Sequence, residues 1–266
     1  MFSSTLVSSS LHQQHVISAS RYRAAGIHVA ISAVIACGVL LGMLFFFYPS
    51  PYFGAVGGKD LLMILIGVDV VLGPLITLII FNPKKKSLKW DLAAIGVMQV
   101  AALVYGAYTM FEARPVYTVF ATDKFVVLTA NNVDAKLLAK VTREEFKKLP
   151  LMGPAIVVAK PPDGEKEQQD LLFVQAMGVG IQYMPQYYVP YNEAVSSVLQ
   201  QAKPLAQLKK LNPQSHHLLA RMLPSLRKQE SEVVFLPVNA RKQVMTALLD
   251  GKTGKILKIE AVSPWR

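Results

Sequence analysis

The chain has 266 residues, of which 52% are hydrophobic and only 17% are charged. A soluble globular protein carries about 25% charged residues. The deficit lies in residues 1–111, which hold 7 Lys and Arg and 3 Asp and Glu, whereas residues 112–266 hold 21 and 14 and are ordinarily polar. This division excludes a simple soluble enzyme and a disordered chain. It predicts a membrane protein with one polar domain that is long enough to form its own core.

Three apolar runs are each long enough to cross a bilayer, which takes about 20 helical residues. These predicted spans cover residues 27–48, 61–81 and 92–111. Pro49 ends the first, Asn82-Pro83 ends the second, and Asp91 is a good N-cap for the third. We therefore predict three transmembrane helices that form a membrane domain over residues 21–111.

The basic residues beside the spans predict the orientation. Six of them lie at one end of the predicted bundle: Arg21, Arg23, Lys84, Lys85, Lys86 and Lys89. The loop between the first two spans holds only Lys59. Because short loops rich in Lys and Arg stay in the cytoplasm, we predict that the N-terminus and the lysine loop are cytoplasmic. Residues 112–266 then lie on the other side of the membrane, which in a Gram-negative cell is the periplasm.

Residues 1–20 are rich in Ser, Gln and His and contain no Lys or Arg. A signal peptide requires positive charge before its apolar segment and a cleavage site of small residues after it. The first span is too long for a signal peptide, and Tyr48-Pro49 after it is a poor cleavage context, so we predict a disordered cytoplasmic tail over residues 1–20.

Asp69 lies inside the second predicted span, between Gly67 and Gly73. An ionisable group at that depth indicates a function by default. Two roles stay open: a hydrogen bond to a neighbouring helix through Ser32, Thr77 or Gln99, or binding of another membrane helix, which small glycines favour. An aspartyl protease needs a second carboxyl at the same site. Asp91 cannot supply it, because Asp69 lies about 18 Å from the cytoplasmic end of its helix.

Pro74 follows Asp69 in the same span. Proline cannot donate a backbone hydrogen bond, so we predict a kink near Val70. The kink frees a carbonyl group that Gln99 or a partner helix could satisfy.

After residue 111 the hydrophobic pattern changes to short strands and helices. We predict strands over residues 116–120, 125–130, 156–160, 232–237, 243–249 and 255–262, and helices over 134–149, 165–177, 193–211 and 215–226. The turn Asp250–Gly254 indicates a hairpin. The fold class is therefore a membrane protein with three transmembrane α-helices followed by one α+β periplasmic domain, residues 112–266, with an antiparallel sheet.

Signals for catalysis are few. The sequence contains no nucleophile elbow, no Walker A motif and no His-Glu-x-x-His. The Gly-Lys-Thr-Gly-Lys stretch at 251–255 lacks the spacing of a phosphate loop and fits the hairpin turn instead. The lone Cys37 excludes an internal disulfide. We predict no catalytic residue, no metal and no cofactor.

Four tyrosines lie close together in the polar domain: Tyr183, Tyr187, Tyr188 and Tyr191. Tyrosine is enriched at protein interfaces, so the cluster is a candidate contact surface. A packed loop explains the same composition equally well.

Six motifs in the membrane region occur together in a fixed order. They are Arg21–His28, Tyr48–Pro51, Gly57–Leu61, Gly67–Pro74, Asn82–Lys84 and Ala113–Val116. In this order and spacing they resemble the TfpX/TfpZ family of type IV pilin accessory proteins. The resemblance is close over about residues 21–130 and looser beyond. It implies an inner-membrane protein that helps a major pilin become surface pili and that has no catalytic activity.

The leading hypothesis is a non-enzymatic accessory protein that binds type IV pilin subunits and the lipid bilayer, and no nucleic acid. Two alternatives stay open. One is a pilin-modifying membrane enzyme such as a glycosyltransferase. The other is a membrane-anchored periplasmic sensor or scaffold.

Overall fold

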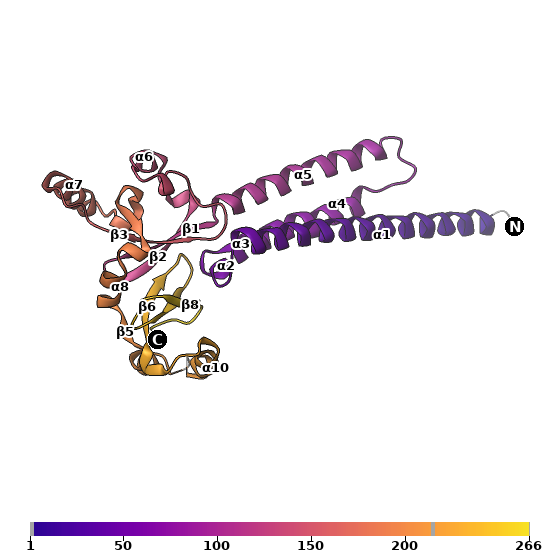
Figure 1. Ribbon diagram of the computed structural model, residues 1–266. Helices are drawn as coiled ribbons and strands as arrows, with labels where there is room; N and C mark the ends of the chain where they lie inside the picture. Colours follow the sequence, from indigo (N-terminus) through magenta and orange to yellow (C-terminus); the bar gives the residue numbers. More distant parts are fainter. Residues whose placement is uncertain (1–2, 214–215, 266) are drawn as a thin grey trace. The chain divides into compact units, whose positions relative to one another are not determined.

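The computed structural model describes residues 3–213 and 216–265 and divides into two units (Figure 1). One unit, here called the membrane unit, comprises the parts of the membrane helices within residues 1–43 and 59–110. The other, here called the sheet domain, comprises residues 44–58 and 111–266.

Three long apolar helices are present, as predicted. Their elements are α1 (Ser3–Gly42), the π-helical turn η1 (Met43–Phe47), α3 (Gly58–Ile66), the π-helical stretch η2 (Gly67–Leu72), α4 (Gly73–Ile80) and α5 (Leu88–Glu112). The segments long and apolar enough to cross a membrane are Ser20–Phe47, Gly58–Ile80 and Leu88–Glu112. The chain is therefore a membrane protein, and its spans begin a few residues earlier than the sequence pattern predicted.

The first helix differs from the prediction at its N-terminus. It begins at Ser3, so residues 3–20 continue the first span as helix, whereas the sequence predicted a disordered tail. Residues 3–25 contain neither Gly nor Pro, so nothing in the backbone chemistry interrupts the helix.

The helices of the membrane unit pack against one another through few buried residues. Helix α1 lies against η2 and α4. Helix α5 approaches α3 closely at Gly106, where a Cβ atom would lie 2.6 Å from Leu65 Cδ1. Large apolar side chains such as Val34 and Val97 stay exposed on the outer faces. This distribution suits helices whose surroundings are lipid.

The sheet domain contains eight strands within the described residues. They are β1 (Pro115–Ala121), β2 (Lys124–Thr129), β3 (Ala155–Ala159), β4 (Tyr188–Pro190), β5 (Lys203–Pro204), β6 (Val233–Asn239), β7 (Val244–Asp250) and β8 (Ile256–Glu260). The α-helices are α2 (Tyr52–Ala55), α6 (Ala135–Leu138), α7 (Glu165–Ala176), α8 (Val195–Gln201), α9 (Leu205–Leu211) and α10 (His216–Leu226). Short 3₁₀ turns join them at η3 (Ala130–Asn132), η4 (Glu144–Phe146), η5 (Ile181–Tyr183), η6 (Pro185–Tyr187), η7 (Tyr191–Glu193) and η9 (Glu230–Glu232).

The sheet is mixed, whereas the sequence predicted an antiparallel one. The strand order is β4-β3-β1-β2-β6-β7-β8, with β5 beside β6. Strands β1 and β3 pair in parallel, and so do β2 and β6. Long connections precede β3 and β6, and only a long connection lets a chain return to pair in parallel. The hairpins β1–β2, β6–β7 and β7–β8 are antiparallel, and the last of them is the one predicted from the turn at Asp250–Gly254.

Two predicted helices are wrong. Residues 134–149 form only the short α6 and the turn η4, because Val141 and Phe146 are both drawn into the core. Residues 193–211 break between α8 and α9 at Lys203-Pro204, which pairs with β6 as β5. Proline lacks an N–H group and disfavours a helical residue before it, so the break follows from the sequence.

The segment between the first two spans belongs to the sheet domain. We call residues 48–58 the interspan segment. Tyr48, Tyr52, Ala55 and Val56 are buried. The Thr118 hydroxyl on β1 donates to Tyr52 Oη over 3.0 Å. Burial raises the pKa of the Tyr52 hydroxyl above its usual value, and the bond to Thr118 opposes that rise. The domain predicted from the sequence began at residue 112 and therefore did not include this segment.

Candidate functional site in the membrane helices

The second span unwinds at the point where Pro74 removes a donor. Residues 67–72 form the π-helical stretch η2, and Pro74 follows it. In a π-helix the N–H of residue 74 would bind the carbonyl of residue 69, so proline leaves that carbonyl free. Gln99 Nε2 on α5 donates to the Asp69 carbonyl over 3.1 Å. The site of the predicted kink is a π-helical stretch, and Gln99 satisfies the carbonyl that Pro74 leaves free.

A chain of hydrogen bonds continues from Gln99 across all three spans. Gln99 Oε1 lies 2.5 Å from His28 Nε2 on α1. His28 Nδ1 lies 2.7 Å from Thr77 Oγ1, and the same hydroxyl lies 3.1 Å from the Gly73 carbonyl, so its single proton can go to either acceptor. Because the amide nitrogen of Gln99 donates to Asp69, its oxygen is left to accept from His28. We call His28, Asp69, Thr77 and Gln99 the polar cluster.

The two predicted glycines have different surroundings. A Cβ atom on Gly73 would lie 1.9 Å from Gln99 Nε2, so this glycine lets α5 approach the second span. A Cβ atom on Gly67 would meet nothing within 4 Å. Gly73 therefore belongs to the packing of the polar cluster, and Gly67 lies on an open face of the helix.

The Asp69 carboxyl group is the unexplained part of the cluster. The residue is only 6% exposed, yet neither carboxyl oxygen has a hydrogen-bond partner among the described residues. Gln99 binds the backbone of Asp69 instead of its side chain. A buried polar group without a partner is uncommon and calls for an explanation. Within a membrane span the default explanation is a functional one.

Asp69 borders a cavity of about 510 Å³ between α1 and α5. We call this cavity the membrane groove. The second span contributes Asp69 and Thr77 to it, and the remaining lining residues are Ala24, Ile27, His28, Ile31, Ser32, Ile35, Ala36, Leu92, Gly96, Gln99, Val100 and Leu103. The groove is thus mainly apolar, and the four residues of the polar cluster line it from all three spans.

Among the predicted topology residues, two make defined contacts. Arg21 Nε donates to the Phe81 carbonyl over 2.6 Å, so the start of the first span lies at the end of the second. A cation is favourable at a helix C-terminus because of the helix dipole. Lys85 forms an ion pair with Asp91 over 2.6 Å. Arg23 and the other predicted lysines, Lys84, Lys86 and Lys89, are exposed.

The predicted tyrosine cluster is packed into the sheet domain. Tyr188 is buried against Tyr117 and Phe146, its hydroxyl donates to the Gln182 carbonyl, and burial raises its pKa. The Tyr191 hydroxyl donates to the Gly254 carbonyl over 2.6 Å, and burial raises its pKa to about 12. Tyr183 and Tyr187 are half-buried against the same core. The packed-loop interpretation therefore describes these residues.

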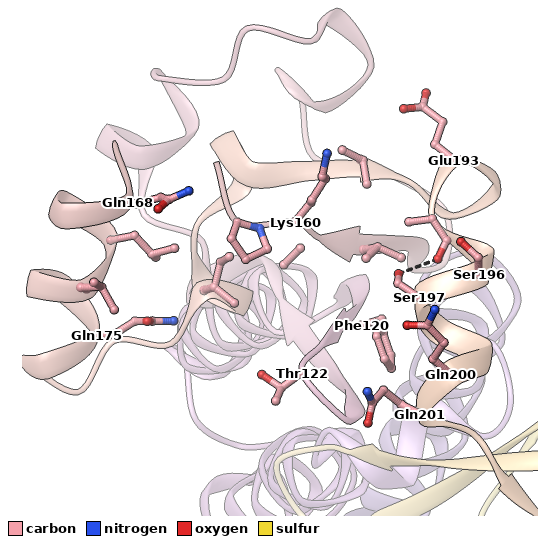
Figure 2. Close-up of a pocket in the computed structure, with 18 of the residues that line it drawn as sticks. Phe120, Thr122, Lys160, Gln168, Gln175, Glu193, Ser196, Ser197, Gln200 and Gln201 are labelled. Atoms are coloured by element: carbon pink, nitrogen blue, oxygen red, sulfur yellow. Dashed lines mark hydrogen bonds between the residues drawn. The ribbon is translucent and has the colours of Figure 1, made fainter. Parts of the chain in front are cut away.

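The sheet domain holds a second cavity, of about 750 Å³, which no sequence motif indicated. Figure 2 shows glutamines of α7 on one side and serines and glutamines of α8 on the other. Ser197 donates to the Ala194 carbonyl over 2.8 Å and has no base beside it in the described contacts. Arg143 and Glu193 neutralise each other at the edge, over 2.9 Å. Lys160 also lines the cavity and pairs with Asp163 over 3.6 Å. The cavity thus offers mainly neutral hydrogen-bonding groups, with one lysine.

The described residues contain no group of three or more His, Cys, Asp or Glu side chains that could hold a metal ion.

Sequence reasoning missed two features. His28 is the second residue of the predicted first span, too near its end for the depth rule that selected Asp69, but it lies inside the span that the structure shows, Ser20–Phe47. The cavity of the sheet domain gave no signal, because its lining comes from segments between residues 120 and 201 that share no motif.

Comparison with known proteins identifies the family. No family model and no solved structure matches the chain. Fimbrial assembly proteins of Dichelobacter nodosus do match. The serogroup E1 protein is 32% identical over 85% of this chain and 89% of its own length. The serogroup I protein is 31% identical over the same shares. The protein of serogroups C1 and C2 is 38% identical over 41% of this chain and 84% of its own length. A three-span membrane protein with this α+β domain thus belongs to the family of fimbrial assembly proteins.

Proposed function

We propose that the chain is a non-enzymatic accessory protein of type IV pilus assembly and that it binds pilin subunits within the membrane. Its family of fimbrial assembly proteins supports a role in pilus biogenesis. The resemblance to the TfpX/TfpZ family supports the type IV class. The observation that carries the binding role is the Asp69 carboxyl group, which is buried beside the membrane groove with no partner in the described chain.

The groove suits a transmembrane helix as its ligand. Its apolar walls belong to α1 and α5, and Gly96 at its side leaves at least 4 Å of open space. Small residues let helix backbones approach closely. A helix with a hydroxyl, amide or amine donor at the depth of Asp69 would supply the missing hydrogen bond. A pilin awaiting assembly is held in the inner membrane by an apolar helix, so it presents a ligand of this kind.

The proposal places residues 112–266 in the periplasm and the lysine loop in the cytoplasm, following the distribution of basic residues. Two contacts support this arrangement. Arg21 at the start of the first span reaches Phe81 at the end of the second. The interspan segment is bonded to β1, so it lies on the same side of the membrane as the sheet domain.

A pair of photocrosslinking positions on α5 tests the binding site. Val100 lines the groove, whereas Met98 does not, and both side chains are exposed. The two positions point about 200° apart around the helix. We expect a crosslinker at Val100 to capture pilin and one at Met98 to capture none. Equal capture from both positions would contradict a binding site in the groove, and so would crosslinks only to other copies of the chain.

The alternatives make different predictions for a strain without the protein. A pilin-modifying enzyme predicts that the mass of pilin changes when the gene is deleted. A sensor or scaffold predicts changed signalling with normal surface pili. The proposed binding role predicts fewer surface pili with pilin of unchanged mass, which electron microscopy and mass spectrometry distinguish.

A further inference from the structure

We propose that the sheet domain binds the lipid surface beside the first two spans. Two loops of the domain make this contact, residues 147–153 and residues 240–243, which we together call the lipid-contact surface. The inference concerns lipid and does not depend on pilin binding.

Chain connectivity places the interspan segment at the bilayer surface. Its first residue directly follows Phe47, the last residue of the first span, and its last residue is Gly58, the first of the second span. The ring of Phe47 also lies 5.3 Å from that of Phe111, next to the end of the third span. Because a span ends where the hydrocarbon ends, residues 48–58 start and finish at headgroup level.

Both loops touch this segment. A Cβ atom on Gly153 would lie 3.5 Å from Pro49 Cγ, so the tip of the first loop lies against the chain two residues beyond the first span. The backbone N–H of Lys242 donates to the Ala55 carbonyl over 2.8 Å. The two loops, which are about 90 residues apart in the sequence, therefore meet the same short stretch of chain at the bilayer surface.

The side chains of these loops have the chemistry of a membrane contact. Leu151 and Met152 are adjacent, large and apolar, and they are 64% and 70% exposed. Lys148 in the same loop and Arg241 in the other are exposed basic residues, whereas Lys147 is paired with Glu144. Apolar side chains that enter the interface, with basic side chains beside them, bind bilayers that carry anionic lipid. The proposed ligand is thus an anionic phospholipid surface.

Helix α7 offers a matched control. Leu172 and Phe173 on α7 are exposed to the same degree as Leu151 and Met152. Figure 1 shows α7 on the side of the sheet domain away from α2, which belongs to the interspan segment. Exposure alone would make both patches equal, whereas position at the bilayer surface selects only the loop of residues 147–153.

The experiment uses the full chain in lipid nanodiscs. Cys37, which is exposed, is replaced by Ser, and one cysteine is introduced by Met152→Cys, Leu151→Cys or Leu172→Cys. Each is labelled with an environment-sensitive fluorophore. We expect lipids with a nitroxide near the headgroup to quench the label at 152 and at 151 several-fold more than the label at 172. Equal quenching at 152 and 172 would overturn the proposal.

Charge variants test the basic residues separately. In nanodiscs with phosphatidylglycerol, we expect Lys148→Glu with Arg241→Glu to reduce quenching at 152 several-fold, and much less in phosphatidylcholine alone. Unchanged quenching with anionic lipid would overturn the assignment of an anionic surface. Protection of the label only when pilin is added would overturn the lipid assignment in favour of a protein contact. Thermal unfolding of each variant checks that the sheet domain is folded.

Discussion

Asp69 has two oxygen-bearing groups with different surroundings. Its carbonyl is bound by Gln99, whereas its carboxyl group borders the membrane groove without a partner in the described chain. Packing of the three spans therefore uses the backbone at this residue, and the side chain is available to a ligand. This separation allows the structural and the binding role to be tested apart.

The first prediction concerns the side chain of Asp69. Asp69→Asn keeps an acceptor oxygen of the same reach, whereas Asp69→Leu removes it. We expect the Asn variant to retain more pilin crosslinking at position 100 than the Leu variant, by an amount equivalent to about 1–2 kcal/mol per hydrogen bond. Both should be present at normal levels, because Gln99 binds only the backbone. Complete loss of crosslinking in both variants would favour a role that needs the charge.

The second prediction compares the two glycines of the second span. Gly73→Ala would place a Cβ atom 1.9 Å from Gln99 Nε2, whereas Gly67→Ala meets nothing within 4 Å. We expect Gly73→Ala to lower the thermal stability of the protein in detergent, by about 1–3 kcal/mol for overpacking. Gly67→Ala should leave stability unchanged. Equal stability of the two variants would mean that Gln99 moves away at little cost.

At the residue scale the sequence indicated the right region but not the contacts. Depth in the span selected Asp69, and the missing donor of Pro74 predicted a freed carbonyl, since both effects are local. Which oxygen Gln99 binds depends on how α5 lies against the second span, and that geometry has no signature in the sequence.

The elements of the sheet domain depend on backbone geometry at a few glycines. Gly254 in the turn between β7 and β8 has φ +68°, and Gly178 after α7 has φ +89°. An L side chain is unfavourable in this left-handed region, by about 1–2 kcal/mol. The two positions differ in their space, because a Cβ atom on Gly254 would lie 2.2 Å from Val195 Cγ1 and one on Gly178 would meet nothing.

The third prediction uses this difference. We expect Gly178→Ala to show the backbone cost alone, and Gly254→Ala to show that cost with a further ~1–3 kcal/mol from overpacking. Thermal unfolding followed by near-ultraviolet circular dichroism measures both. An equal loss of stability in the two variants would mean that α8 gives way to the new methyl group.

The fourth prediction concerns pH. Lys228 Nζ lies 2.6 Å from Asp250 Oδ2, and the Thr253 and Lys252 N–H groups donate to Oδ1. These contacts, with Lys228 as the largest cause, hold the pKa of Asp250 well below its usual range. Asp250 therefore stabilises the fold at pH values above the carboxyl pKa of the unfolded chain, which is about 4. This stabilisation is lost as the pH falls toward the lower pKa of the folded state.

We therefore expect Lys228→Gln to lower the unfolding temperature most at neutral pH, with the difference from wild type narrowing below about pH 4. Lys160→Gln serves as the control, because Lys160 and its partner Asp163 are both exposed. A difference for Lys228→Gln that stays constant with pH would show that the ion pair does not cause it.

At the element scale the sequence predicted what local patterns determine. The hairpins and α7 follow from turn residues and periodicity, which operate over a few residues. The parallel pairing of β2 with β6 joins residues more than 100 positions apart, so no local sequence pattern predicts it. The prediction of one helix over residues 134–149 is wrong for a related reason. Val141 and Phe146 pack into the core separately, which a local pattern does not show.

The fifth prediction concerns the whole chain. Three helices that each cross the membrane would put the sheet domain and the lysine loop on opposite sides, as we propose. We expect an alkaline phosphatase fused after Arg266 to be active, since it reaches the periplasm, and one fused after Lys86 to be inactive. The reverse pattern would contradict the proposed orientation.

At the scale of the molecule the sequence predicted three spans and one domain, because about 20 consecutive apolar residues are a direct signal. It did not predict that residues 48–58 belong to the domain. Their buried tyrosines are ordinary residues in a short loop, and only the position of β1 turns them into core.

This membership has a consequence for biosynthesis and for the design of soluble fragments. Ribosomes add about 5–20 residues per second, so Tyr52 leaves the ribosome several seconds before the strand that buries it. The membrane insertion of two spans thus precedes completion of the domain core.

A fragment that starts at residue 112 lacks Tyr48, Tyr52 and Val56 and leaves their pocket open to solvent. We expect such a fragment to aggregate, and one that carries residues 48–58 on a flexible N-terminal linker to stay monomeric in size-exclusion chromatography.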